Sequence, residues 1–303
     1  MKNFTKLLLS NIEIYEKFKS DFTYHSSNIE GSKISKEDNS ILVSNITKTA
    51  KNSIMEQYEK DEIIENRNLG IIFDTMFKNY TSEFSIQELK EWHRILKTDT
   101  DWSVLYPNAV GKFRTVNIEV GDSINFAIDF KNINEQIFNL IADLNYIQNL
   151  TIKDIANLHC RFEQIHPFQD GNGRIGRMIM IKQCLKSLIP PFFINSITKN
   201  EYINCLKMFH KTLNDNFLTE YLIKQQQLFL NEYSIYLMEY SKKEKEIINY
   251  LMKNTEINRI MVEKILNIKP STANLLLNKM IKNNLITKKD NGKNSYYVLK
   301  EYY

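Results

Sequence analysis

Glycine and proline are scarce in this chain, which has only 8 Gly and 5 Pro among 303 residues. Both residues break helices, so long flexible loops are not expected and a helical fold is favoured. Cysteine is scarce as well, and Cys160, Cys184 and Cys205 lie in apolar stretches without the spacing of a metal site. Three buried thiols, an odd number, argue against a disulfide framework and indicate a reducing compartment.

Long hydrophobic runs are also missing. No stretch approaches the ~18 apolar residues of a membrane span, and the N-terminal MKNFTKLLLSNIEIYEKF has neither the apolar centre nor the cleavage site of a signal peptide. We therefore expect a cytoplasmic protein without membrane contact. Its hydrophobic fraction of 43% and charged fraction of 25% are ordinary for a globular protein. The length allows two or three domains of roughly 100–200 residues.

Positive charge is concentrated at the C-terminal end. Residues 241–303 hold 13 Lys and Arg against 6 Asp and Glu, a net charge of +7, although the whole chain carries only +4. This asymmetry predicts a basic C-terminal domain beside a near-neutral body.

The remaining pattern predicts a mainly α fold. Ser35 and Ser85 stand where helices begin, each with acidic residues in the following turn. Thr151 begins a further helix that runs to about His166. Apolar and polar residues alternate over residues 116–128, on both sides of a Gly-Asp-Ser turn, which predicts a short β-hairpin.

The basic tail shows a pattern of its own. Helices are expected at 244–253, 255–266 and 271–283, and strand-like runs follow at 285–287 and 295–299. Three helices and a basic hairpin are typical of a winged helix-turn-helix domain.

The most informative segment reads HPFQDGNGRIGR, from His166 to Arg177. Gly171 and Gly173 bracket Asn172, so the backbone can turn several N–H groups toward one anion at the start of a helix. Such a cradle is typical of phosphate binding.

Four side chains complete the chemistry of this segment. Arg174 and Arg177 are three residues apart on the new helix, and arginine suits bidentate phosphate contact. Asp170 offers the hard oxygen that phosphate-bound Mg²⁺ requires. His166 is the nearest side chain that can accept a proton near neutral pH. Together they indicate nucleotidyl or phosphoryl transfer.

The segment resembles the signature of Fic domains, His-Pro-Phe-x-Asp/Glu-Gly-Asn-Gly-Arg-x-x-Arg, at every fixed position. Gly111-Lys112-Phe113-Arg114 resembles the approach to the Fic flap hairpin. The resemblance covers about residues 80–230. It implies a helical Fic core with a β-hairpin flap at 80–240, after an N-terminal helical region at 1–79 and before a winged-helix domain at 241–303.

The resemblance implies a protein adenylyltransferase that moves AMP from Mg-ATP to a Tyr, Thr or Ser hydroxyl of a target protein. His166 would be the base, and Asp170 would hold Mg²⁺. Arg174 would contact the β-phosphate and Arg177 the γ-phosphate. The hairpin would pin the target segment by strand pairing. The anion cradle would be lined by Gly171, Asn172 and Gly173.

Three ring side chains around this core have structural interpretations beside the functional one. Tyr202 either stacks on adenine, as similar positions do in the family, or is a core aromatic. His93 and His159 lie among apolar residues and are expected to be core histidines.

Residues 26–31, Ser-Ser-Asn-Ile-Glu-Gly, resemble the inhibitory motif of the second Fic class. A carboxylate from Glu30 would compete with the γ-phosphate for Arg177. Ser26 lies one turn earlier on the same helix face and would hold the helix near the phosphate loop. The chain is therefore expected to be autoinhibited.

Several alternatives stay open. A DNA-binding regulator, in which the Fic domain senses nucleotide, is the competing function. The tail either contacts DNA or serves as a protein–protein module that packs on the core or forms homodimers. The target protein and its acceptor residue are not indicated, and the chain itself is one candidate. Inhibition within one chain or across a homodimer is equally compatible with the sequence.

Overall fold

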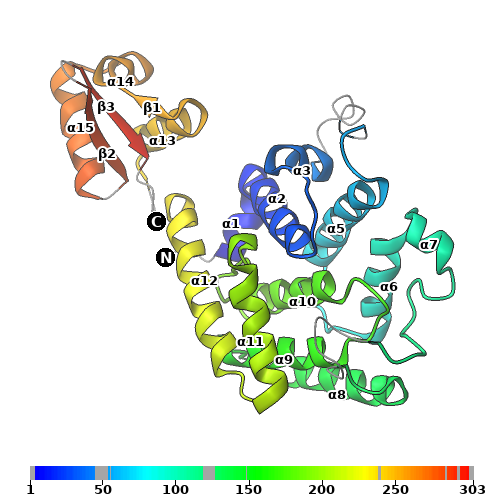
Figure 1. Cartoon of the computed structure of the whole chain (residues 1–303). Coiled ribbons are helices and arrows are strands. Elements are labelled where there is room, and N and C mark those ends of the chain that lie inside the picture. Colours follow the sequence, from blue (N-terminus) through cyan, green and yellow to red (C-terminus); the bar gives the residue numbers. More distant parts are fainter. Residues whose placement is uncertain are drawn as a thin grey trace. The chain divides into compact units, whose positions relative to one another are not determined.

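The computed structural model of the chain describes residues 4–44, 54, 56–118, 127–147, 149–237, 240–283, 285–291 and 294–299. The fold is mainly α, as the sequence predicts, and a small three-stranded sheet is the β structure of the described residues. Two compact units divide the chain, one of residues 3–229 and one of residues 230–303 (Figure 1). No helix in the described part combines the length and apolarity needed to cross a membrane.

The larger unit is built from helices. They are α1 (Phe4–Ser10), α2 (Ile12–Ile29), α3 (Lys36–Val43), α5 (Lys60–Lys78), α6 (Ile86–Lys97), α7 (Asp101–Leu105), α8 (Ile133–Tyr146), α9 (Ile152–Ile165), α10 (Asn172–Lys186), α11 (Lys199–Thr212) and α12 (Asn216–Leu237), with 3₁₀ turns η1 (Phe130–Asn132) and η2 (Ser196–Thr198). The last helix, α12, continues into the smaller unit.

Polar caps begin these helices where the sequence predicts. The Ser35 hydroxyl accepts a hydrogen bond from the backbone of Asp38 at the start of α3, and Ser85 does the same at α6. Thr151 and Asp154 form a reciprocal capping box at α9. Each cap satisfies an N–H group that the first turn leaves unpaired, and contributes about 1 kcal/mol.

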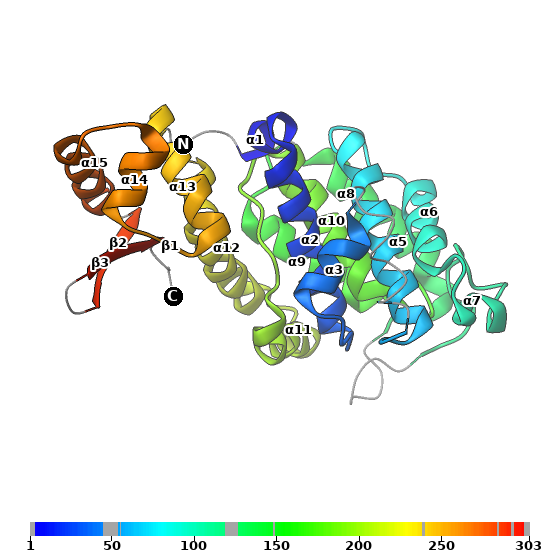
Figure 2. The same ribbon diagram turned by 90° about the horizontal axis from the view of Figure 1, so that it is seen from above.

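Helix α10 is the centre of the larger unit and packs against α2, α5, α6 and α9 (Figures 1 and 2). Almost every residue from Asn172 to Leu185 is buried, as expected of a helix enclosed on all sides. Gly176 allows the close approach of α9, since a Cβ there would lie 2.7 Å from Glu163 Oε1 and 2.9 Å from Phe162 Cδ1.

Aromatic packing anchors α2 in this unit. The ring of Phe18 lies 5.6 Å from that of Phe73 in α5, 5.0 Å from that of Phe193 and 5.8 Å from that of Phe229 in α12, measured between ring centroids. Buried rings of this kind contribute both area and specific geometry. They fix the helix whose C-terminal end carries Glu30.

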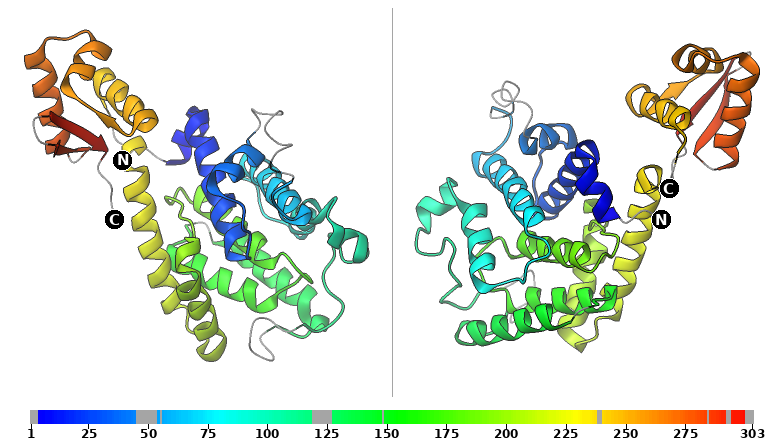
Figure 3. Two further views of the ribbon diagram at one scale, coloured as in Figure 1. Left: turned by 45° about the horizontal axis from the view of Figure 1, so that its top comes forward. Right: turned by 180° about the vertical axis from the view of Figure 1, so that it is seen from behind.

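The smaller unit contains α13 (Lys242–Asn254), β1 (Glu256–Ile257), α14 (Arg259–Leu266), α15 (Pro270–Lys282), β2 (Ile286–Asn291) and β3 (Asn294–Leu299). The strands are antiparallel in the order β1-β3-β2, and β2 packs against α15 (Figure 3). A separate hydrophobic core joins helices and sheet, with Ile247, Val262, Leu277 and Tyr297 among its members.

The predicted helix start at Thr255 is wrong. Thr255 has a positive φ of 59°, and Glu256–Ile257 pairs with β3 instead. The helix begins at Arg259, because Asn258 is the residue whose side chain caps the first turn, by accepting from Met261 N.

The predicted hairpin over 116–128 falls largely outside the described residues, which omit 119–126. The flanking residues 116–118 and 127–128 are described, and they are not in strands. Hydrogen bonds from Arg114 attach these flanking residues to the rest of the unit.

Candidate functional site

The end of α9 presents His166 to a cavity. His166 closes the helix in a left-handed conformation, φ 47° and ψ 63°, and its N–H donates to Phe162 O at 2.9 Å. Its Nδ1 lies 3.2 Å from the carbonyl oxygen of Glu163. A carbonyl can only accept, so Nδ1 carries the proton and Nε2 is left as the proton acceptor.

Asn172 ties the turn after His166 into a closed loop. Its amide accepts from Phe168 N and donates to Phe168 O, both at 2.8 Å. Phe168 is buried and stacks on His93 with ring centroids 4.1 Å apart. The Asn172 side chain thus shapes the loop by bonding to the backbone of Phe168.

His93 holds the middle of this loop from α6. Gly111 N donates to its Nδ1 at 2.9 Å, so Nε2 bears the proton and donates to Asp170 O at 3.1 Å. The ring is fully buried, as expected from its apolar surroundings. Gly171, at φ 83°, allows the close packing, because a Cβ there would lie 2.8 Å from Leu96 Cδ2.

Arg114 joins the loop to both ends of the flap segment. Its guanidinium donates to the carbonyl oxygens of His166 at 2.8 Å, Ile165 at 3.2 Å and Val116 at 2.8 Å, and also to that of Ile128. One buried side chain therefore binds the turn at His166 and both described flanks of residues 119–126.

Arg177 is held by α2. Its Nε donates to Ser26 Oγ at 2.9 Å, and Nη2 donates to Ser26 O at 2.8 Å and to Glu30 Oε1 at 2.5 Å. The guanidinium is buried, and Glu30 ends α2 as its C-cap. The three residues that the sequence relates are thus brought together within one chain.

Asp170 and Arg174 belong to a group of four charges. Lys97 Nζ forms ion pairs with Asp170 and with Glu65, and Arg174 Nη1 forms an ion pair with the same Glu65. Arg174 Nη2 lies 3.7 Å from Asp170 Oδ1. Sequence reasoning missed Glu65 and Lys97, since no short motif links them to the loop.

Most of the predicted site residues line a first cavity of about 300 Å³. Glu163, His166, Arg177 and Glu30 contribute to its wall, and the loop adds Asp170, Gly171, Asn172 and Gly173. The opposite wall comes largely from α11, with Tyr202, Ile203, Leu206, Lys207 and His210.

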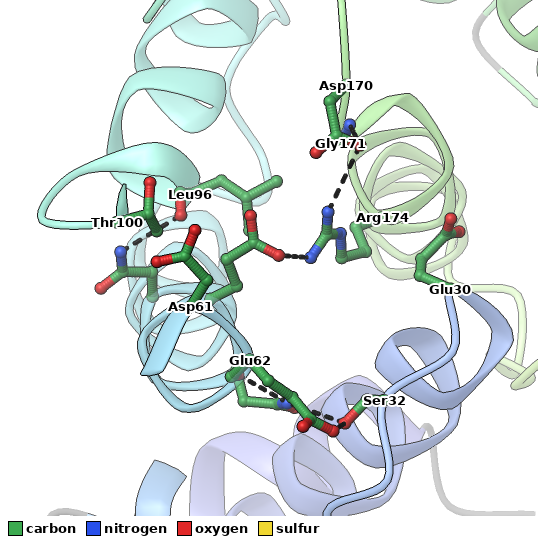
Figure 4. Close-up of polar contacts among 12 residues, drawn as sticks. Glu30, Ser32, Asp61, Glu62, Leu96, Thr100, Asp170, Gly171 and Arg174 are labelled. Atoms are coloured by element: carbon green, nitrogen blue, oxygen red, sulfur yellow. Dashed lines mark hydrogen bonds and ion pairs between the residues drawn. The ribbon is translucent and has the colours of Figure 1, made fainter. Parts of the chain in front are cut away.

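Arg174 does not line the first cavity. It faces a second cavity of about 370 Å³, together with Glu65, Asn66 and residues of the turn after α2. Glu30 and Asp170 line both cavities. Figure 4 shows where Glu30, Asp170 and Arg174 lie on α2, the loop and α10.

Tyr202 has almost no exposed surface, 1% of its side chain and backbone area. Its hydroxyl lies 2.6 Å from His159 Nε2, and the two rings stack at 5.9 Å between centroids. This position matches the core interpretation better than a ring face open to adenine. His159 is buried too, as expected.

Burial and neighbouring charge set the protonation of the site. Burial lowers the pKa of His166 to about 4, so the imidazole is neutral at pH 7. Burial opposes ionisation of Asp170, but Arg174 and Lys97 outweigh it and lower that pKa to about 2. Burial raises the pKa of Glu163, which lies between His159 and His166, to about 8. A neutral imidazole and an ionised carboxylate thus share one cavity.

A Mg²⁺ ion fits this donor set only as part of a metal–phosphate complex. The described residues contain no cluster of three or more His, Cys, Asp or Glu side chains that could hold a metal alone. Asp170 is a hard, ionised oxygen donor whose side chain is 46% exposed in the wall of both cavities. One carboxylate with phosphate oxygens and water is a common Mg²⁺ environment.

The family profile described as Fic/DOC family matches residues 83–184, which include α6, α9, the loop and most of α10. The chain carries a Fic/DOC family domain. Protein adenylyltransferase fic-1 of Caenorhabditis elegans is 29% identical over 185 residues, 60% of this chain and 34% of that protein. Protein adenylyltransferase Fic of Drosophila erecta is 28% identical over 187 residues, 61% of this chain and 36% of that protein.

The chain spans about a third of the length of these curated relatives. Solved structures share its fold. A Fic-domain-containing signaling protein from Bacteroides thetaiotaomicron has a TM-score of 0.60 at 21% identity, over 72% of this chain and 87% of that one. Fic-1 of C. elegans has a TM-score of 0.58 at 23% identity, over 73% and 63%. The matched stretch lies within the larger unit, and Glu30 and Glu65 lie before it.

Proposed function

We propose that this protein is an adenylyltransferase that transfers AMP from ATP to a hydroxyl side chain of a target protein. The supporting observation is that His166, Asp170, the glycine-flanked start of α10 and Arg177 face one cavity. A base, a hard oxygen ligand and an anion cradle in one wall match the needs of nucleotidyl transfer. The adenylyltransferase relatives support the same assignment.

The base is His166. Its Nδ1 is committed to Glu163 O, so Nε2 takes the proton of the target hydroxyl. The hydroxyl oxygen then forms a bond to the α-phosphorus, and the bond from that phosphorus to the bridging oxygen of pyrophosphate breaks. The products are an AMP-modified side chain and pyrophosphate.

The remaining residues position and neutralise the triphosphate. Gly171, Asn172 and Gly173 start α10, whose N-terminal end favours anions. Arg174 would meet the β-phosphate and Arg177 the γ-phosphate. Asp170 would hold Mg²⁺, which supplies charge neutralisation on the phosphates when bound. Tyr202 would support the nucleotide cavity as a wall residue through His159.

Glu30 is the brake in this proposal. Its carboxylate occupies the Arg177 guanidinium that the γ-phosphate needs, and it lines both cavities. A triphosphate that reaches from the first cavity to Arg174 must therefore displace it. Ser26 keeps α2 against Arg177 through two further hydrogen bonds.

The acceptor is proposed to be a protein segment held near the flap, and the chain itself is one candidate. Arg114 holds both flanks of the flap segment beside His166.

We place the reaction in the cytoplasm, because Cys160, Cys184 and Cys205 are unpaired, as expected where thiols stay reduced.

The decisive experiment compares incorporation of α-labelled and γ-labelled ATP by the parent, Glu30→Gly and Glu30→Gly/His166→Ala, with the protein itself and a lysate as acceptors. Label from the α-phosphate alone, raised by Glu30→Gly and lost with His166→Ala, supports AMP transfer and the brake together. Label from the γ-phosphate would instead indicate a kinase-like reaction, and no label in any variant would contradict the proposal.

The smaller unit supports a second candidate function, DNA binding by a winged helix. The outer face of α15 exposes Asn274, Asn278 and Lys282, and β2 exposes Lys288 and Lys289. Amide and lysine side chains on one helix face suit base and phosphate contact.

Mobility shift with a random duplex pool tests this second candidate. Lys288→Ala/Lys289→Ala is expected to weaken binding across sequences and to lower the salt dependence by about two phosphate contacts. Lys279 is less suited to that role, because it forms an ion pair with Glu244 at 3.0 Å. An absence of any shift at low salt would favour a protein–protein module.

A further inference from the structure

Four charged side chains from four elements form a closed ring beside the phosphate loop. Lys97, at the end of α6, contacts the carboxylates of Asp170 and of Glu65 from α5. Arg174 of α10 contacts the other oxygen of Glu65, and its Nη2 lies 3.7 Å from Asp170 Oδ1. Figure 4 shows Arg174 reaching from α10 between Asp170 and the carboxylates on the α5 side. Each carboxylate thus faces both cations.

Three members of the ring line a cavity and one stands behind them. Asp170 lines both cavities, and Arg174 and Glu65 line the second. Lys97 lines neither and has only 1% of its side chain exposed, and Glu65 has 14% exposed. Trp102 covers the Lys97 ammonium at 4.8 Å from the ring centroid. Lys97 and Glu65 are therefore fixed charges that water screens weakly.

We propose that Glu65 and Lys97 are positioning residues that set how strongly nucleotide binding depends on a divalent cation. The inference rests on the proposed function, because it takes Asp170 and Arg174 as the groups that meet the metal–nucleotide. Lys97 lines neither cavity and acts through the Asp170 carboxylate that it pairs with. Glu65 lines the second cavity and acts through Arg174, whose guanidinium it pairs with.

The two residues act with opposite sign. Lys97 shares the Asp170 carboxylate with any incoming cation and repels it, whereas Glu65 attracts a cation and takes up part of the Arg174 charge that a phosphate needs. Removing the Lys97 charge leaves the ring with a net negative charge, and removing the Glu65 charge leaves it net positive. The first change favours metal-bound nucleotide, and the second favours nucleotide without metal.

The test measures ATP affinity by calorimetry, in excess Mg²⁺ and in EDTA, with Glu30→Gly/His166→Ala as the parent so that neither the brake nor turnover interferes. The ratio of the Kd in EDTA to the Kd in Mg²⁺ is the readout. Lys97→Met is expected to raise this ratio roughly tenfold and Glu65→Gln to lower it roughly tenfold, since a unit charge at such distances is worth a few RT. The double variant restores neutrality and is expected to return the ratio close to that of the parent.

Arg94→Met and Glu91→Gln are matched controls, because they make the same charge changes in an exposed ion pair of the same helix. They are expected to leave the ratio within about twofold of the parent, since water screens exposed charges. If Lys97→Met does not fold, Glu65→Gln and the double variant still decide the outcome.

A merely structural role would weaken ATP binding in both conditions alike and leave the ratio unchanged, which would overturn the inference while leaving the proposed function intact. A parent that binds no ATP even with Mg²⁺ would overturn both. Opposite shifts of the ratio in the two single variants would support the inference.

Discussion

Arg177 donates to Oε1 of Glu30 at 2.5 Å, within a single chain and 147 residues apart in sequence. Ser26 supplies two further acceptors to the same guanidinium. Burial opposes the charged form of Glu30, but Arg177 and Arg174 outweigh it and lower the pKa of that carboxyl. The carboxylate therefore stays ionised and paired at physiological pH, at the place where a terminal phosphate would bind.

Replacing Glu30 with glycine is expected to raise AMP transfer about tenfold or more, because Arg177 is then available to the γ-phosphate and an ion pair no longer has to be broken. Transfer of α-labelled AMP measures it. Glu59→Gly is the matched control, since this exposed carboxylate lines the second cavity without contacting Arg177. Equal gains in both variants would show that general negative charge, and not the Glu30–Arg177 contact, restrains the site.

The pH dependence of transfer should report His166. Its pKa of about 4, lowered chiefly by burial, keeps the base unprotonated over the whole neutral range. In the Glu30→Gly variant, kcat/KM is therefore expected to stay level from pH 8 to about 5 and to fall only as pH approaches 4. Circular dichroism at each pH controls for acid unfolding. An acidic limb centred near pH 6.5 would indicate that the imidazole is solvated during the reaction.

Arg114→Gln is expected to separate target use from nucleotide binding. The change removes donors to the carbonyl oxygens of His166, Ile165, Val116 and Ile128, so the flap flanks lose their attachment to the catalytic turn. AMP transfer should fall about tenfold or more, whereas ATP affinity should stay within about threefold, because Arg114 contacts no residue of the anion cradle.

Arg161→Gln is the control for this effect, since Arg161 forms a partly exposed ion pair with Asp143 on the neighbouring helices α9 and α8. It should alter transfer little. If Arg114→Gln weakened ATP binding as strongly as transfer, the arginine would support the whole loop rather than the flap.

Glu163→Gln is expected to change the pH dependence of stability. Burial raises the pKa of Glu163 to about 8 in the folded protein, above the ordinary value of 4.5, so the parent loses stability as pH rises through this range. Glutamine cannot ionise, and the variant should gain on the order of 2–4 kcal/mol over the parent between pH 5 and pH 8. Denaturant unfolding at both pH values measures the difference.

Glu135→Gln is the control, because it makes the same change at an exposed carboxylate of α8. If the free energies of unfolding of Glu163→Gln and of the parent changed in parallel from pH 5 to pH 8, Glu163 would already be solvated or paired when ionised.

Local structure could be predicted from the sequence alone. The caps at Ser35, Ser85 and Thr151 are confirmed, because each depends on a hydrogen bond to a residue three positions away. The loop that begins at His166 could be predicted for the same reason. Its turn, its glycines and the start of the following helix lie within twelve consecutive residues, so their geometry follows from short-range sterics.

Tertiary structure decided what depends on helices distant in sequence. The predicted helix start at Thr255 is wrong because the pairing of Glu256–Ile257 with β3 involves residues about forty positions away. The sequence allows two roles for Tyr202, and its burial against His159 favours the core role. Glu65 and Lys97 carry no local signal, since a buried ion pair forms only where packing brings opposite charges together away from water. The sequence by itself thus determined the turn and helix start of residues 166–177, and only the packing of α2, α5 and α6 around α10 determined which charges face them.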